Sequence, residues 1–237
     1  MTNTKRQMSD TYLVAAILAS AGGFLDAYSY LVRGNVFANA HTANIVLLGM
    51  SFFERDWLSC GKYLAPIVMF IAGVLVADRI RSRLSASRFH WRQYVILLEA
   101  AVLVVASFIP HGNWDIVANV LISFVCSLQV ESFRKVHSIP FSTTLCTGNL
   151  RTATESLSHY MTHKDEESLS VAFKLFGIVL FFTMGVIFGT LISAASGRAA
   201  LAFAIIELIA VFVLMLIDNE KGEAKTEEQT EAKTEEQ

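Results

Sequence analysis

The sequence predicts an all-α membrane protein with about six transmembrane helices, arranged as two inverted three-helix repeats that each contain a re-entrant or half-helix Thr-x-Asn segment. The first observation is composition: 54% of the 237 residues are hydrophobic and only 17% are charged, whereas soluble domains average about 25% charged residues. The apolar residues also gather in runs long enough to cross about 30 Å of hydrocarbon. The second observation is that polar residues of the first half recur in the second half.

Six apolar stretches are expected to span the bilayer, near residues 12–32, 62–78, 93–110, 115–132, 170–192 and 199–217. The first is predicted to be a transmembrane helix and not a cleaved signal peptide, because it is apolar beyond the small residues at 19–21 and carries Asp26. Together the six form an integral membrane domain over residues 1–217. Residues 218–237 have no apolar face and are predicted to be an acidic, disordered cytoplasmic tail.

The internal repeat is carried by polar groups inside apolar surroundings. Three pairs of positions keep the same order in both halves: Thr42-Ala43-Asn44 with Thr147-Gly148-Asn149 and Asp26 with Glu131, each 105 residues apart, and Glu99 with Glu207, 108 residues apart. Repeat one is then about 12–110 and repeat two about 115–217. Each repeat holds three spans, an odd number, so the second copy enters the membrane from the opposite side.

The basic residues predict the orientation. Five arginines lie between Arg79 and Arg92, so this connection is expected to face the cytoplasm by the positive-inside rule. With six spans both termini are then cytoplasmic, and the connection His111–Trp114, which has no lysine or arginine, is outside. The motif Thr42–Asn44 is then expected near the outer face and Thr147–Asn149 near the inner face.

The segments that contain the two motifs, 34–53 and 139–158, are expected to be half-helices buried by other helices, because the second is too polar for lipid contact. The alternative is eight spans with parallel copies. Thr and Asn are residues that cap helix N-termini, and a half-helix beginning there would direct its positive dipole end toward the membrane interior, where it could bind an anion. Ordinary capping with nothing bound is the simpler interpretation.

The carboxyl groups allow two interpretations each. Asp26 either lines a proton or cation pathway or pairs with Arg33 and only fixes orientation. Glu207, near the middle of its span, is either a proton relay or a protonated side chain that holds helices together, since burial favours the neutral acid. Glu99 is either its counterpart in a relay or a partner of Arg92 or Arg88.

The sequence around these residues resembles the YoaK family of bacterial integral membrane proteins of unknown function. The resemblance is carried by residues 23–30 (GFLDAYSY), 34–39 (GNVFAN), Thr42–Asn44 with Leu48-Gly49, and Thr147–Leu150. It covers nearly the whole chain except the acidic tail. The family's first motif is usually Thr-Gly-Asn, and Ala43 replaces the glycine here. The resemblance implies a multi-pass protein of the bacterial inner membrane and implies no activity.

We therefore expect a small secondary transporter with a site between the inverted repeats, in which Asp26, Glu131 and Glu207 handle protons or cations. The alternative is a non-transporting membrane protein that serves interaction or assembly. The expected solute- or ion-binding residues are Asp26, Thr42, Asn44, Glu99, Glu131, Thr147, Gly148, Asn149 and Glu207. No enzymatic activity, cofactor or metal is expected; the expected partners are the lipid bilayer, a small solute or proton, and other copies of the chain, but not nucleic acid.

Overall fold

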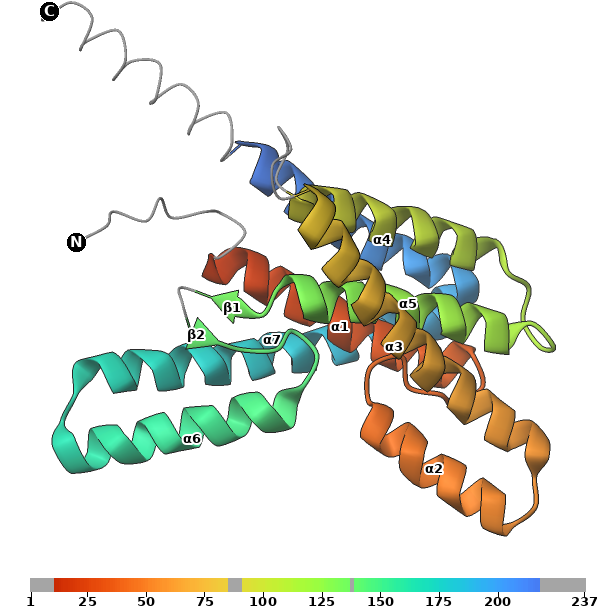
Figure 1. The fold of residues 1–237 in the computed structure, drawn as a ribbon, viewed down its shortest axis with the longest axis horizontal. Coiled ribbons are helices and arrows are strands. Elements are labelled where there is room, and N and C mark those ends of the chain that lie inside the picture. The colour runs from red at the N-terminus through yellow and green to blue at the C-terminus, as the bar shows by residue number, and fades with distance from the viewer. Residues whose placement is uncertain (1–10, 85–90, 137–138, 218–237) are drawn as a thin grey trace, which may run out of the picture.

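A computed structural model describes residues 11–84, 91–136 and 139–217 as a bundle of helices (Figure 1). The predicted tail, 218–237, and part of the basic connection, 85–90, lie outside the described residues. The elements are α1 (Tyr12–Val32), α2 (His41–Phe53), α3 (Trp57–Leu84), α4 (Trp91–Phe108), α5 (Asp115–Ser132), β1 (Lys135–Val136), β2 (Ile139–Pro140), α6 (Cys146–His163), α7 (Glu166–Ser196), the 3-10 turn Gly197–Ala200, and a last helix over 201–217. The two short strands pair antiparallel just before α6.

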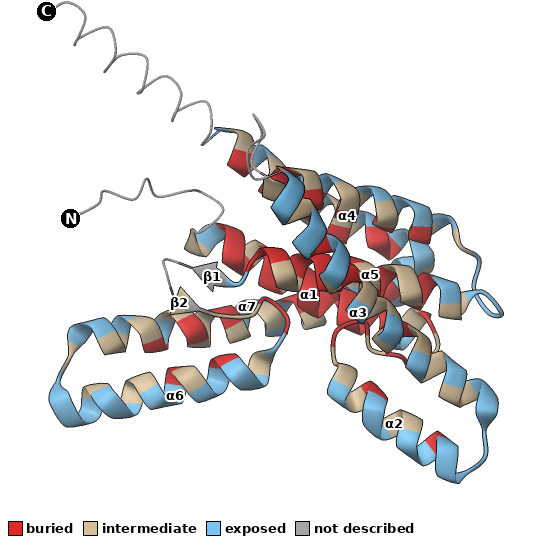
Figure 2. Cartoon of the chain, in the orientation of Figure 1, coloured by how far each residue is buried: buried red, intermediate tan, exposed pale blue. Residues whose placement is uncertain are grey.

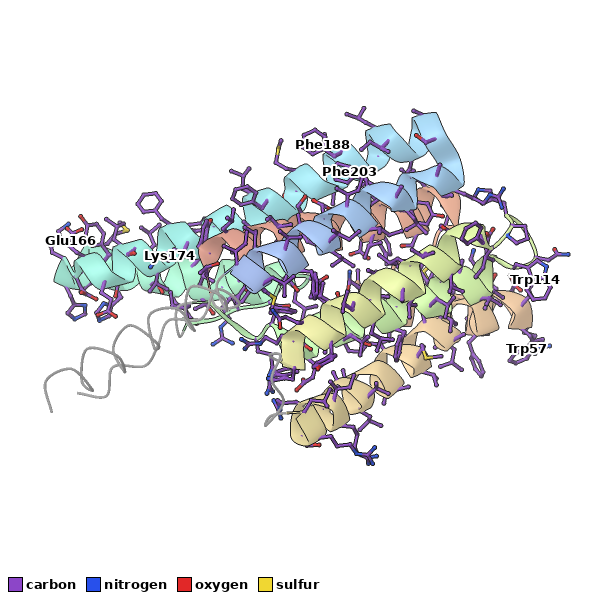
Figure 3. The ribbon with its side chains drawn as sticks, turned by 90° about the horizontal axis from the view of Figure 1, so that it is seen from above. Trp57, Trp114, Glu166, Lys174, Phe188 and Phe203 are labelled. Carbon is purple, nitrogen blue, oxygen red and sulfur yellow. The ribbon has the colours of Figure 1, made fainter. Side chains whose placement is uncertain are left out.

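Among the described residues, five helical runs are long and apolar enough to cross a membrane: α1, α3, α4, α5 and Glu166–Ile217. The fifth run has 52 residues and as one straight helix would be about 78 Å long, far more than the hydrocarbon thickness. It turns back at Gly197, whose φ is +56°. Gly189 before the turn and Phe203 after it both contact Phe24 of α1, so α7 and 201–217 are antiparallel neighbours (Figure 3).

The two motif-bearing helices do not qualify as spans. Helix α2 has 13 residues and is therefore about 20 Å long, shorter than the hydrocarbon layer. Helix α6 has 18 residues but is not among the runs that are apolar enough. The eight-span alternative is therefore not supported.

The first helix of each half lies at the centre of the bundle. In the most apolar stretch of each helix, the buried share of residues is 78% in α1 and 56% in α5, against 17% in α3 (Figure 2). Helix α1 packs along α7, and α3 packs along α5. The outer helices carry exposed apolar side chains, among them Leu64, Val68, Ile71 and Leu75 on α3 and Leu180, Phe188 and Leu191 on α7. Such surfaces suit contact with lipid tails.

Glycines allow these two helix pairs to approach closely. Gly73 of α3 lies against the backbone of Phe124 in α5. Gly185 of α7 lies against the backbone of Ser20 in α1. Small residues at helix crossings are typical of membrane interiors, where close backbone packing replaces the hydrophobic driving force.

Exposed tryptophans mark one end of the bundle. Figure 3 shows Trp57 and Trp114 at the same end and Glu166 at the other. Tryptophan is enriched at membrane interfaces, so this end is assigned to one interface. Helix α3 begins at Trp57 and carries Arg81 and Arg83 in its last turn, which places the basic segment at the opposite end. The predicted separation of the arginine-rich connection from the 111–114 connection therefore agrees with the bundle.

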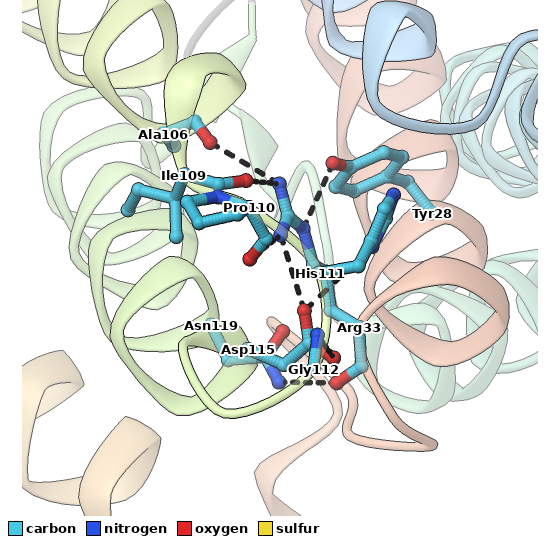
Figure 4. A network of polar contacts seen from close by, with 9 residues as sticks. All are labelled: Tyr28, Arg33, Ala106, Ile109, Pro110, His111, Gly112, Asp115 and Asn119. Atoms are coloured by element: carbon cyan, nitrogen blue, oxygen red, sulfur yellow. Dashed lines mark hydrogen bonds and ion pairs between the residues drawn. The ribbon is translucent and has the colours of Figure 1, made fainter.

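A buried arginine ties α1 to the ends of α4 and α5 (Figure 4). The side chain of Arg33 is fully buried. Its guanidinium donates to Tyr28 Oη (3.0 Å), the carbonyl oxygens of Ala106 (3.3 Å), Ile109 (2.9 Å) and Pro110 (3.2 Å), and Asp115 Oδ1 (3.1 Å). Helix C-termini leave carbonyl groups without intrahelical partners, and Arg33 supplies donors to those of α4.

This network corrects the alternative in which Asp26 pairs with Arg33. The ion pair of Arg33 is with Asp115, 82 residues away. The reason is geometric: Arg33 follows the last turn of α1 and reaches outward to the α4–α5 connection. Asp26 lies nearly two turns earlier, and its carboxylate is not the partner of Arg33.

Candidate functional site

The two half-helices begin at the centre of the molecule. In Figure 1, α2 and α6 run away from the centre in opposite directions, with their N-terminal ends facing inward. Between these ends and the flanking helices α1 and α7 lies a cavity of about 610 Å³. Its polar side chains include those of Asp26, His41, Thr42, Thr144, Thr147 and Thr190. Gly148 also lines it, and apolar side chains such as Phe37 and Phe182 form much of the rest.

Both Thr-x-Asn segments thus contribute to one cavity. The predicted topology puts Thr42–Asn44 near the outer face and Thr147–Asn149 near the inner face. The helices do extend toward opposite ends of the bundle, but their first turns, where the motifs lie, meet in the middle. The motifs therefore lie together at one cavity and not near opposite faces.

The asparagines of the motifs do not line the cavity; they hold the backbone that precedes each half-helix. Asn44 Oδ1 accepts from the backbone N–H of Phe37 (3.1 Å), and its Nδ2 donates to the carbonyl oxygen of the same residue (2.7 Å). Asn149 makes the same two bonds with Ser142, at 3.0 and 2.6 Å. Each asparagine is buried and clamps the backbone seven residues earlier. This folds the chain back so that the first turn of each half-helix faces the cavity.

The predicted capping role is therefore wrong. Helix α2 begins after Ala40 and α6 after Leu145, and neither N-terminus has a side-chain cap. The motif threonines are the second residue of each helix and the asparagines the fourth, so the asparagine side chains are engaged elsewhere. In α6 the first-turn N–H groups are left without an acceptor in the described part of the chain, whereas in α2 those of His41 and Ala43 donate to the carbonyl oxygens of Asn39 and Ala40.

Asp26 is the acidic residue that lines the cavity. Only 6% of the residue is exposed. Its Oδ1 accepts from the backbone N–H of Asn39 at 2.8 Å, so the carboxylate also fixes the loop that precedes α2. A carboxylate held by backbone amides in a cavity can still bind a proton or a cation on its cavity side.

The three glutamates of the predicted site lie elsewhere. Glu131 forms ion pairs with Arg81 (3.6 Å) and Arg134 (3.5 Å), so the match between Asp26 and Glu131 does not extend to their surroundings. Both carboxyl oxygens of Glu99 are buried, and in the described part of the chain neither has a hydrogen-bond partner. Glu207 contacts Ser20 of α1 through a hydrogen bond. None of the three is among the described residues that line the cavity.

His41 and Thr144 line the cavity but were not among the site residues predicted from the sequence. Each lies within three residues of a motif threonine, so widening each motif by one helical turn toward the N-terminus would have found them. The aromatic lining residues Phe37 and Phe182 could not have been found, because they look like any other apolar residue near or within a span.

Comparison with known proteins places the chain among membrane proteins without an assigned activity. A family model described as "Protein of unknown function (DUF1275)" matches residues 14–214. The UPF0700 transmembrane protein YoaK of Bacillus subtilis (strain 168) is 27% identical over 158 residues, which cover 64% of this chain and 69% of that protein. No solved structure matches.

Proposed function

Because the chain belongs to the DUF1275 family of proteins of unknown function, its activity has to be inferred from geometry, and we propose that it is a small secondary transporter whose solute site is the central cavity. The observation that carries the proposal is the meeting of two half-helix N-termini and one carboxylate at a cavity inside a membrane bundle. Discontinuous helices whose positive ends point at a midplane site are typical of secondary transporters. The cavity volume is also within the range of small-molecule sites.

An inverted repeat is part of this proposal. Asn44 bonds to the backbone of residue 37, and Asn149 bonds to the backbone of residue 142. The two asparagines are 105 residues apart, and so are the two residues that they bond. The first helix of each half packs on the long third helix of the other half, as α1 on α7 and α5 on α3. Two such halves can rock against each other about a fixed central site, which is the usual basis of alternating access. Asp26 is the group proposed to exchange a proton or a cation with the solute.

The orientation is part of the proposal. With the arginine-rich end of α3 in the cytoplasm, both termini are cytoplasmic and the tryptophan-bearing end is outside. A single cysteine at Asn113 should react with an impermeant thiol reagent added to intact cells, in a background without native cysteines. A cysteine at Ser82 should react only after the membrane is opened, and labelling of Ser82 in intact cells would refute this orientation.

The transport proposal predicts that filling the cavity abolishes flux without unfolding the protein. A Cβ built on Gly148 has no atom within 4 Å, so the side chain of Gly148→Leu has room to project into the cavity. Purified protein in liposomes should take up at least one class of small solute faster than empty liposomes, and Gly148→Leu should reduce this flux at least tenfold. Gly61→Leu is the matched control, since Gly61 on α3 also has open space and lies away from the cavity.

The result against the proposal is equally definite. If the folded wild-type protein shows no flux with amino acids, organic acids, amines, sugars or inorganic ions, the chain is not a transporter. If flux is present and equal in both leucine variants, the central cavity is not the route.

A further inference from the structure

The N-terminus of α6 presents unused hydrogen-bond donors to the cavity. In the described part of the chain, the backbone N–H groups of Cys146, Thr147 and Gly148 donate to no acceptor, and all three residues line the cavity. Helix N-termini normally satisfy such groups with a capping side chain or water, yet no side chain caps this one. Three convergent donors at the positive end of an 18-residue helix suit a carboxylate or another small anionic group.

A second, independent feature lies beside these donors. Thr144 is 5% exposed, lines the cavity, and its Oγ1 has no hydrogen-bond partner among the described residues. Buried hydroxyl groups are normally hydrogen-bonded. Thr144 therefore adds a hydroxyl without a partner next to the amide donors.

The wall of the cavity formed by α1 offers a hydrogen-bond acceptor, whereas the N-terminus of α6 offers donors. Asp26 places a carboxyl group there, one oxygen of which accepts from the backbone N–H of Asn39. No lysine or arginine is among the described residues that line the cavity, so the protein supplies no permanent cation to face this carboxylate. Asp26 and Cys146 line the same cavity, so the acceptor and the donors belong to one site.

We propose that the cavity binds a small zwitterion with an apolar side chain, of the amino-acid type. The carboxylate would accept from the first-turn amides of α6 and from the Thr144 hydroxyl, and the ammonium would donate to Asp26. The apolar side chain would pack against Phe37 and Phe182. This inference rests on the proposed function, because it names the solute of the same cavity.

Three ligands that differ by one charged group test the proposal. Phenylalanine carries both groups, 2-phenylethylamine lacks the carboxylate, and 3-phenylpropionate lacks the ammonium. Binding to the purified full chain in detergent is measured by isothermal titration calorimetry. We expect phenylalanine to bind at least about tenfold more tightly than either partial ligand, because each lost charged hydrogen bond costs about a factor of ten or more.

Two variants assign the two ends of the ligand. Thr144→Val keeps the shape of the side chain but removes the hydroxyl; it should weaken phenylalanine and 3-phenylpropionate about threefold to tenfold and leave 2-phenylethylamine unchanged. Asp26→Asn should weaken phenylalanine at least tenfold and leave 3-phenylpropionate undiminished. Thr154→Val is the control, because Thr154 is exposed on α6 and bonds only to the Leu150 carbonyl oxygen.

The outcomes separate this inference from the transport proposal. Equal binding of the amine and phenylalanine would refute the α6 site, and equal binding of the acid would refute the role of Asp26. If none of the three ligands binds while another solute crosses the membrane and Gly148→Leu blocks it, the zwitterion proposal fails and the transporter stands. If phenylalanine binds as described but no solute crosses, the site stands and the transporter fails.

Discussion

Replacing Arg33 with methionine is expected to lower the free energy of unfolding by about 3–5 kcal/mol, the range measured when one partner of a buried ion pair is removed. The loss is large because Asp115, whose side chain is 20% exposed, and the terminal carbonyl groups of α4 would lose their shared, fully buried donor. Thermal unfolding of the purified protein in detergent, followed by circular dichroism, measures the change.

Arg151→Met is the matched control for this substitution. Arg151 also forms an ion pair, with Glu155 at 2.8 Å, but both side chains are exposed. Exposed pairs contribute little to stability, so this variant should unfold near the wild-type temperature. Equal unfolding temperatures for the two arginine variants would contradict the structural importance of the Arg33 network.

Adding a single methyl group at Gly185 should also be strongly destabilising. A Cβ at this position would overlap the backbone carbonyl oxygen of Ser20, and a backbone atom in the middle of α1 cannot rotate out of the way. Helices α1 and α7 would have to separate, with an expected cost of about 3 kcal/mol, at the upper end of typical overpacking effects. Gly23→Ala should behave alike, because its Cβ would overlap the carbonyl oxygen of Phe182.

Gly61→Ala provides the control for these glycine variants. A Cβ there meets no atom within 4 Å, so only helix propensity changes, and alanine favours a helix over glycine by about 1 kcal/mol. Gly61→Ala should therefore unfold at or slightly above the wild-type temperature. A Gly185→Ala protein that is as stable as Gly61→Ala would show that α1 and α7 do not approach this closely.

The long helices could be predicted from the sequence because the bilayer imposes a simple length requirement. The predicted spans 12–32 and 115–132 coincide with α1 and α5, and 62–78 and 170–192 fall within α3 and α7. The other two, 93–110 and 199–217, each extend two residues beyond an α-helix. The half-helix character of α6 was also predictable, since its polar residues exclude lipid contact. Gly197 divides the last two spans, in line with the short connection expected between them.

The arrangement of the site was less predictable, because it depends on contacts between distant segments. The sequence marks Asn44 and Asn149 as equivalent, but an asparagine near a helix start is more often a cap than a clamp on the backbone seven residues earlier. In the same way, Arg33 is closer in sequence to Asp26 than to Asp115, and only the turn of the chain after α1 decides between them. Equal spacing likewise suggested a common role for Asp26 and Glu131, which have different surroundings in the fold.

The central position of α1 has a consequence for how the protein is made. This helix leaves the ribosome before the helices that pack on it. The residues that receive the Arg33 guanidinium, 106–115, follow more than 70 residues later, and α7, whose Gly185 packs against α1, follows later still. Until then Asp26 and Arg33, which are buried in the folded protein, lack the residues that will enclose them. We therefore expect nascent α1 to remain next to the insertion machinery, and to enter the lipid phase only when the second half of the chain arrives to enclose it.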